Sequence, residues 1–148
     1  MLHVSYEART DLPPGRFVQI NEDHGSVEIL LDQNAPLADV VRQFNIEIDG
    51  MVRSGRWFQW WDDDEIVSCN TPGKPLRIEF LLEKREHLGV AFEERKGDLK
   101  ALVDPAIDVV RFAAVMNPLT AQHLSGGRWF QLYGGEIHDV APEPMSQV

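Results

Sequence analysis

The chain has 148 residues, of which 43% are hydrophobic and 26% are charged. This composition is typical of a globular protein and excludes an intrinsically disordered chain, while the length suits one domain or two small units that share a core. Lys and Arg number 14 against 24 Asp and Glu, which gives a net charge of −10. The negative charge argues against nucleic acids and anionic membranes as partners, because both are bound through basic side chains.

Alternating hydrophobicity predicts strands in both halves of the chain. Leu2, Val4 and Tyr6 alternate with polar residues, which is the pattern of a half-buried strand. Strands are predicted at residues 2–6, 17–20, 27–31, 76–80, 90–92 and 99–103. Gly25 and Gly97 lie in the turns before 27–31 and 99–103, so we expect a positive φ at both glycines.

A helix is predicted after the third strand of each half. Pro36 suits the first turn of the first helix, where its missing N–H costs nothing. One side of this helix carries an apolar stripe of Leu37, Val40, Val41, Phe44 and Ile48.

The second helix is predicted to start near Asp104, its expected N-cap, with Pro105 in the first turn. Pro118 is expected to end or kink it. Apolar residues surround this helix, so we expect it to be the more buried of the two; they are Ile107, Val109, Val110, Phe112, Ala113 and Ala114.

Segments of the chain recur in the same order. The pentapeptide Gly-Arg-Trp-Phe-Gln at residues 55–59 returns at 127–131, and Asp-Val-Val-Arg at 39–42 returns at 108–111. A collinear series of matches indicates an internal duplication that nearly exhausts the chain.

We therefore predict an α+β fold of two tandem pseudo-symmetric β-β-β-α-β-β units, with mostly antiparallel sheet and the helices packed on one face. The units are expected to be residues 1–71 and 72–148. Together they should form one compact domain about a pseudo-twofold axis, as the two subunits of an isologous dimer do.

The repeated Arg-Trp-Phe-Gln strands carry the candidate binding residues. Because side chains alternate along a strand, one face of each copy presents two aromatic residues with a glutamine between them. Such a surface can hold a small ligand or a partner's side chain, and the arginines can bind an anion. The alternative is that both faces are core, with each polar group in a structural hydrogen bond or ion pair. The candidate residues are Arg56, Trp57, Gln59, Trp61, Arg128, Trp129, Gln131 and Tyr133.

An acidic run of Asp62, Asp63, Asp64 and Glu65 follows the first of these strands. It is either a solvated turn or an acidic recognition patch, and it lacks the spaced ligands and the glycine of a calcium loop. The five histidines stand far apart, and Cys69, the one cysteine, is expected to be buried and inert. With no phosphate-binding loop or dinucleotide motif either, we predict no metal and no cofactor.

Counted from its third strand, each unit has the order β-α-β-β-β. In element order it resembles the vicinal-oxygen-chelate folds, such as the glyoxalase and bleomycin-resistance proteins. The resemblance implies metal-binding His and Glu residues on strands of both copies, whereas here only Glu65 and Glu136 occupy equivalent strand positions.

These features favour a binding protein over an enzyme. Acidity and aromatic strands without a nucleophile–base pair fit a protein-binding module, such as an immunity or antitoxin-like inhibitor of a basic partner. The alternative is a small-molecule site between the two units, of the vicinal-oxygen-chelate kind or another. The start of the chain has no basic and apolar leader and no apolar run is long enough to span a membrane, which predicts a cytoplasmic protein. The oligomeric state stays open.

Overall fold

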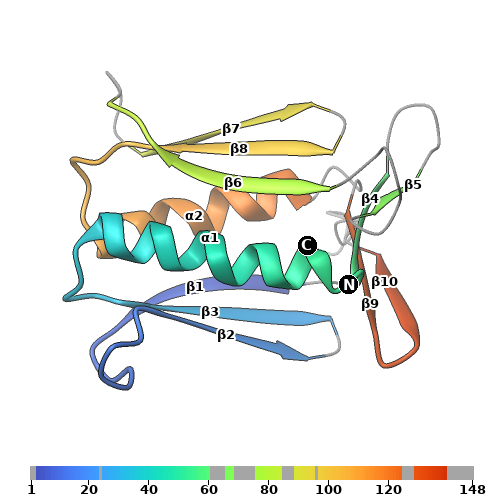
Figure 1. Ribbon diagram of the computed structural model, residues 1–148, viewed down its shortest axis with the longest axis horizontal. Helices are drawn as coiled ribbons and strands as arrows, with labels where there is room; N and C mark the ends of the chain where they lie inside the picture. The colour runs from blue at the N-terminus through green and yellow to red at the C-terminus, as the bar shows by residue number, and fades with distance from the viewer. Residues whose placement is uncertain are drawn as a thin grey trace, which may run out of the picture.

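The computed structural model describes residues 3–23, 25–60, 66–68, 76–84, 89–95, 97–124 and 129–139, with the backbone alone at 60, 66–68 and 137–139. These residues form ten strands and two helices (Figure 1). The elements of the first half are β1 (His3–Arg9), β2 (Val18–Asp23), β3 (Ser26–Asp32), α1 (Leu37–Arg53), β4 (Trp57–Trp60) and β5 (Ile66–Ser68). Those of the second half are β6 (Arg77–Leu82), β7 (Val90–Arg95), β8 (Asp98–Val103), α2 (Val109–Leu124), β9 (Trp129–Tyr133) and β10 (Glu136–Asp139).

Two three-stranded sheets have the same strand arrangement, β1-β3-β2 in the first half and β6-β8-β7 in the second. In each, the middle strand pairs parallel with one neighbour and antiparallel with the other. A third sheet, β10-β9-β4-β5, is antiparallel throughout, so the predicted α+β fold with mostly antiparallel sheet is confirmed. Gly25 and Gly97 have φ values of 68° and 88°, as predicted for their hairpin turns.

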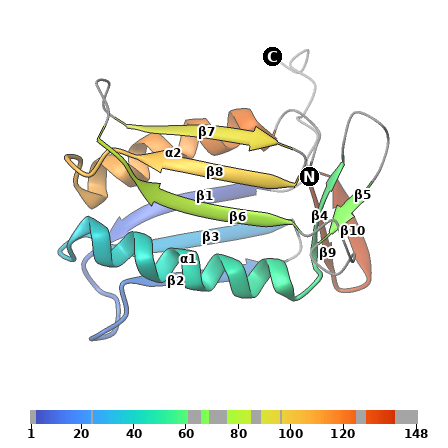
Figure 2. The same ribbon diagram turned by 45° about the horizontal axis from the view of Figure 1, so that its top comes forward.

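The two helices lie between the three-stranded sheets (Figures 1 and 2). α1 contacts β6 and β2, and α2 contacts β1, β3 and β7. Each helix therefore touches strands of both sheets, which differs from the predicted packing on one face. The physical reason is that a three-stranded sheet leaves two edge strands with free peptide groups, and a helix laid across the edges of both sheets covers them.

Two asparagines bond the helices to edge strands of the opposite half. On α1, Asn45 Nδ2 donates to the Phe80 carbonyl at 2.9 Å, and its Oδ1 accepts from the Phe80 N–H at 2.7 Å. On α2, Asn117 makes the same two bonds with the backbone of Tyr6, at 2.9 and 2.7 Å. Each side-chain amide thus takes the place of a peptide group on a neighbouring strand.

Aromatic rings from both halves meet in the core. The Phe44 ring on α1 lies 4.8 Å from that of Phe80 on β6, and 6.1 Å from that of Tyr6 on β1. Phe80 in turn meets Phe112 on α2 edge-on at 6.1 Å. Phe44 and Phe112 are completely buried, so the described core is shared between the halves.

The four-stranded sheet, which we call the end sheet, closes one end of the molecule, at the right of Figure 1. Its central strands β4 and β9 pair antiparallel, with Phe58 opposite Phe130. The inner face is fully buried, whereas Phe58 and Phe130 on the other face are half-buried. The inner-face residues are Trp57, Gln59, Trp129 and Gln131.

The first helix follows its prediction, since Leu37, Val40, Val41 and Phe44 are buried and Ile48 is half-buried. The start of the second helix differs from its prediction. Asp108 Oδ1 accepts from the Arg111 N–H at 2.8 Å and so caps α2, whereas Asp104 Oδ1 bonds the N–H of Ala106 in the preceding turn.

The second helix does not end at Pro118, which was one of the two outcomes predicted there. α2 continues through Pro118 to Leu124. Pro118 has no N–H to donate to the carbonyl of Ala114, four residues earlier in the helix. Because Ala114 is exposed, water can bond this carbonyl instead. Val110 is exposed as well, at 46%, so α2 is not buried on all sides.

The resemblance to vicinal-oxygen-chelate folds does not extend beyond element order. The strands of the unit counted from β3 fall into three different sheets, because β3 pairs with β1 and β2, β4 and β5 belong to the end sheet, and β6 pairs with β8.

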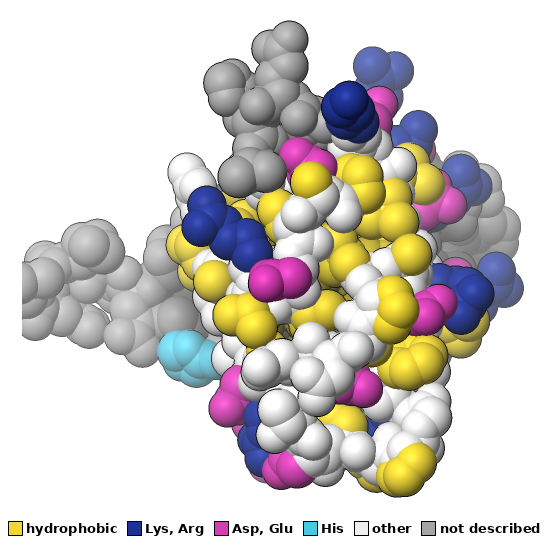
Figure 3. Space-filling model, turned by 90° about the vertical axis from the view of Figure 1, so that its left-hand side faces the viewer, with side chains coloured by type: hydrophobic (Ala, Val, Ile, Leu, Met, Phe, Trp, Pro, Cys, Tyr) yellow, Lys and Arg dark blue, Asp and Glu magenta, His cyan; other side chains and the backbone are white. Residues whose placement is uncertain are grey.

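The end of the molecule opposite the end sheet shows apolar side chains at its centre and charged ones around them (Figure 3). Within the described part of the chain, neither helix is long and apolar enough to cross a membrane.

Candidate functional site

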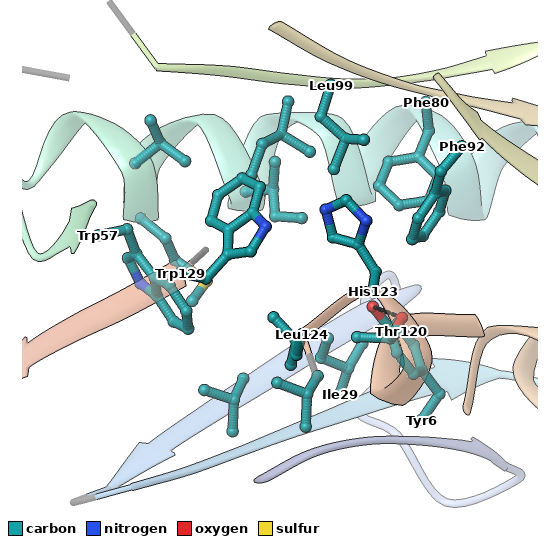
Figure 4. A pocket seen from close by; sticks show the side chains of 16 residues that line it. Tyr6, Ile29, Trp57, Phe80, Phe92, Leu99, Thr120, His123, Leu124 and Trp129 are labelled. Carbon is teal, nitrogen blue, oxygen red and sulfur yellow. Dashed lines mark hydrogen bonds between the residues drawn. The ribbon is translucent and has the colours of Figure 1, made fainter. Parts of the chain in front are cut away.

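A cavity of about 90 Å³ lies between the two three-stranded sheets, beside the inner face of the end sheet (Figure 4). Both of those sheets, both helices, and β4 and β9 contribute to its wall. Val27 and Ile29 come from the first sheet, Phe80 and Leu99 from the second. The cavity is therefore built jointly by the two halves of the chain, and its wall is almost entirely apolar.

Two tryptophans of the end sheet line this cavity, and their indole groups lack hydrogen-bond partners. Trp57 and Trp129 are only 8% and 3% exposed, and neither Nε1 has a partner among the described residues. In Figure 4 the indole nitrogen of Trp129 faces the space between its ring and His123. A buried donor without an acceptor costs about 1–3 kcal/mol. A bound molecule that supplied an acceptor to either indole would remove this cost.

A buried hydroxyl pair forms another part of the wall. Thr120 Oγ1 donates to Tyr6 Oη at 3.2 Å. Burial disfavours the phenolate and raises the pKa of Tyr6 from 10.0 to about 12, although the hydrogen bond from Thr120 acts in the opposite direction. The phenol is therefore neutral at physiological pH and takes no part as a base.

The pKa of Tyr6 predicts a loss of stability in alkali. Between pH 10 and about pH 12, Tyr6 is ionised in the unfolded chain but still protonated in the folded protein. Its ionisation therefore stabilises the unfolded state increasingly over this range. We expect this group to lower the free energy of unfolding by about 3 kcal/mol across that range. Urea unfolding at a series of pH values measures it, and Tyr6→Phe should remove this component. Parallel pH profiles of the two proteins would contradict the assignment.

His123 connects the cavity to the part-buried carboxylate of Glu94. Its ring packs edge-on against Phe92 at 5.3 Å and lies 5.7 Å from the ring of Trp129. Its Nε2 lies 3.4 Å from Glu94 Oε2, which is an ion-pair distance without hydrogen-bond geometry. The one basic side chain among the described lining residues thus lies beside a carboxylate.

Three of the predicted polar residues of the repeated strands, Arg56, Gln59 and Gln131, contact glutamates within the protein. Gln131 Nε2 donates to Glu22 Oε2 at 3.1 Å, and Gln59 Nε2 donates to Glu94. Arg56 Nη2 lies 3.0 Å from Glu22 Oε1. Each glutamine therefore reaches a glutamate of the opposite half, and the guanidinium of Arg56 is already occupied by a carboxylate.

The structure brings four of the predicted binding residues together on the inner face of the end sheet, namely Trp57, Gln59, Trp129 and Gln131. Tyr133 lies farther along β9, with its hydroxyl 3.4 Å from the carbonyl of Glu22. The remaining candidates lie outside the described residues; they are Trp61, Asp62, Asp63, Asp64, Glu65 and Arg128. Cys69, which was expected to be buried and inert, also lies outside them. Within the ranges that the structure describes, no group of three or more His, Cys, Asp or Glu side chains could hold a metal ion.

Sequence reasoning missed the contribution of α2 to this site. No functional role was predicted from the sequence for His123 or for Thr120. Thr120, His123 and Leu124 stand three and four positions apart, so they share one helix face. Two polar residues at that spacing beside an apolar neighbour were the available signal for a helix face that lines a cavity.

Comparisons of the chain with protein-family models, with curated proteins and with solved structures found no match. The cavity and its chemistry are therefore the basis for a functional proposal.

Proposed function

We propose that the protein binds a small molecule in the cavity between its two halves. The observation that carries this proposal is the pair of buried indole donors, Trp57 Nε1 and Trp129 Nε1, which line an apolar cavity and have no acceptor among the described residues. Apolar walls with a small number of convergent polar groups are typical of small-molecule sites. The bonds of Gln59, Gln131 and Arg56 to glutamates then serve to hold the end sheet in place beside the cavity.

Cavity filling tests this proposal. The probes are a library of neutral small molecules, and the readout is the melting temperature, because a ligand that binds the folded state stabilises it. We expect compounds that raise the melting temperature of the unaltered protein to have no effect on Leu99→Phe, whose larger ring occupies the cavity.

Leu81→Phe is the matched control, because Leu81 is 37% exposed and does not line the cavity. It should respond to the same compounds as the unaltered protein. The proposal fails if no compound raises the melting temperature, or if the compounds that do so act equally on Leu99→Phe.

The internal duplication belongs to the same proposal. Its support is that element order, sheet order and the bonds of Asn45 and Asn117 recur in both halves, and that the repeated strands pair with Phe58 opposite Phe130. With units of 1–71 and 72–148, the cavity lies where the two copies meet, and such junctions are common places for ligand sites.

The net charge of −10 supports a second candidate, the acidic module that binds a basic protein. Association driven by such a charge weakens as salt screens it. A partner captured from a native lysate should therefore be basic and should dissociate as the ionic strength is raised. A partner retained in high salt would contradict this candidate.

A further inference from the structure

The polar atoms that line the cavity indicate which kind of ligand it takes, and this inference rests on the proposed function. Indole nitrogens donate hydrogen bonds and do not accept them, so Trp57 Nε1 and Trp129 Nε1 both require an acceptor. The oxygen of Tyr6 already accepts from Thr120, and the Glu94 carboxylate already meets Gln59 and His123. The two indoles therefore favour a ligand that carries an acceptor, and His123 Nε2 is a further lining atom without a hydrogen-bond partner.

The charges beside the cavity disfavour an anionic acceptor. Among the described lining residues His123 is the one basic side chain, and Glu94, which is 12% exposed, lies 3.4 Å from it. The nearby guanidinium of Arg56 is paired with Glu22. A carboxylate or phosphate would lose its hydration without gaining a counter-charge, whereas a neutral carbonyl or ether oxygen loses much less.

The volume of the cavity limits the size of the ligand. An apolar protein cavity of about 150 Å³ holds benzene. At about 90 Å³, the present cavity accommodates correspondingly fewer atoms. We infer that it takes an uncharged molecule, or the end of one, with about four or five non-hydrogen atoms, whose carbonyl or ether oxygen accepts a hydrogen bond from Trp129 Nε1.

Three probes of equal size test the inference on the full chain. They are 2-butanone, 2-methyl-1-butene, in which a methylene replaces the carbonyl oxygen, and propanoate, which carries a negative charge. The indole N–H signal of Trp129 in nitrogen–proton correlation spectra reports the hydrogen bond directly. We expect 2-butanone to move this signal downfield, the alkene to leave it without a hydrogen-bond shift, and propanoate not to bind at neutral pH.

A change of the donor separates hydrogen bonding from apolar burial. 2-Butanone and 2-methyl-1-butene differ in hydration, so their affinities are not compared with each other. For each probe, the dissociation constant of the variant is compared with that of the unaltered protein. Trp129→Phe keeps an aromatic ring and removes the donor, and it should weaken 2-butanone about tenfold more than it weakens the alkene. Phe92→Leu is the control, because Phe92 lines the cavity without offering a donor, and it should change both affinities equally.

The outcomes distinguish this inference from the proposed function. If Trp129→Phe weakens both neutral probes equally, or if propanoate binds more tightly than 2-butanone, the ligand class is wrong and the cavity remains a binding site. If neither neutral probe binds the unaltered protein, the proposed function falls as well. Should Trp129→Phe fail to fold, the shift of the indole signal in the unaltered protein decides: its absence with 2-butanone bound overturns the inference.

Discussion

Residues 1–71 expressed without residues 72–148 are expected to remain unfolded as a monomer. The reason is that the first half depends on the second for its contacts. The Phe44 ring packs on Phe80 at 4.8 Å, the backbone of Tyr6 is bonded by Asn117, and β4 pairs with β9. Without these partners the half-chain cannot bury enough apolar surface to offset the conformational entropy of folding.

Circular dichroism and tryptophan fluorescence measure this expectation, and size-exclusion chromatography establishes the oligomeric state. An equimolar mixture of the two half-chains is expected to recover the spectrum of the intact protein, because each supplies the helix and strands that the other lacks. A folded monomer of residues 1–71 would show that the halves are independent and would contradict the shared core.

Asn117→Ala and Asn45→Ala are each expected to lower the free energy of unfolding by about 2–4 kcal/mol. Each substitution leaves one backbone N–H and one carbonyl of a part-buried edge strand without a partner, at Tyr6 or at Phe80. An unpaired group of this kind costs about 1–3 kcal/mol. That is a large fraction of the total stability of an ordinary domain, which is about 5–15 kcal/mol.

Chemical denaturation measures both changes. Asn21→Ala is the matched control, because the side chain of Asn21 bonds Gln19 and Glu28 on an exposed face of the first sheet. Its effect should stay below about 1 kcal/mol, since water replaces lost bonds at the surface. Equal losses of stability in all three variants would contradict the idea that Asn45 and Asn117 pair backbone groups that would otherwise lack a partner.

Local patterns in the sequence determined most of the secondary structure. The alternation around Val4 and Tyr6, the glycines of the hairpin turns and the apolar stripe of α1 all depend on neighbouring residues, and all were predicted correctly. The start of α2 and its continuation past Pro118 were not, because both depend on the tertiary surroundings. Asp108 rather than Asp104 caps the helix, and Pro118 is tolerated where the unbonded carbonyl faces solvent.

The sequence also identified the strands that contain Trp57 and Trp129, but it left open whether they are core or site. Only the tertiary structure decided how the two strands meet, since pairing between β4 and β9 joins residues more than 60 positions apart. The same holds for the placement of α1 against β6, which is set by the free edges of both sheets. The cavity could not be predicted from local patterns in the sequence. Both three-stranded sheets, both helices, β4 and β9 build its wall, and only the tertiary structure brings them together.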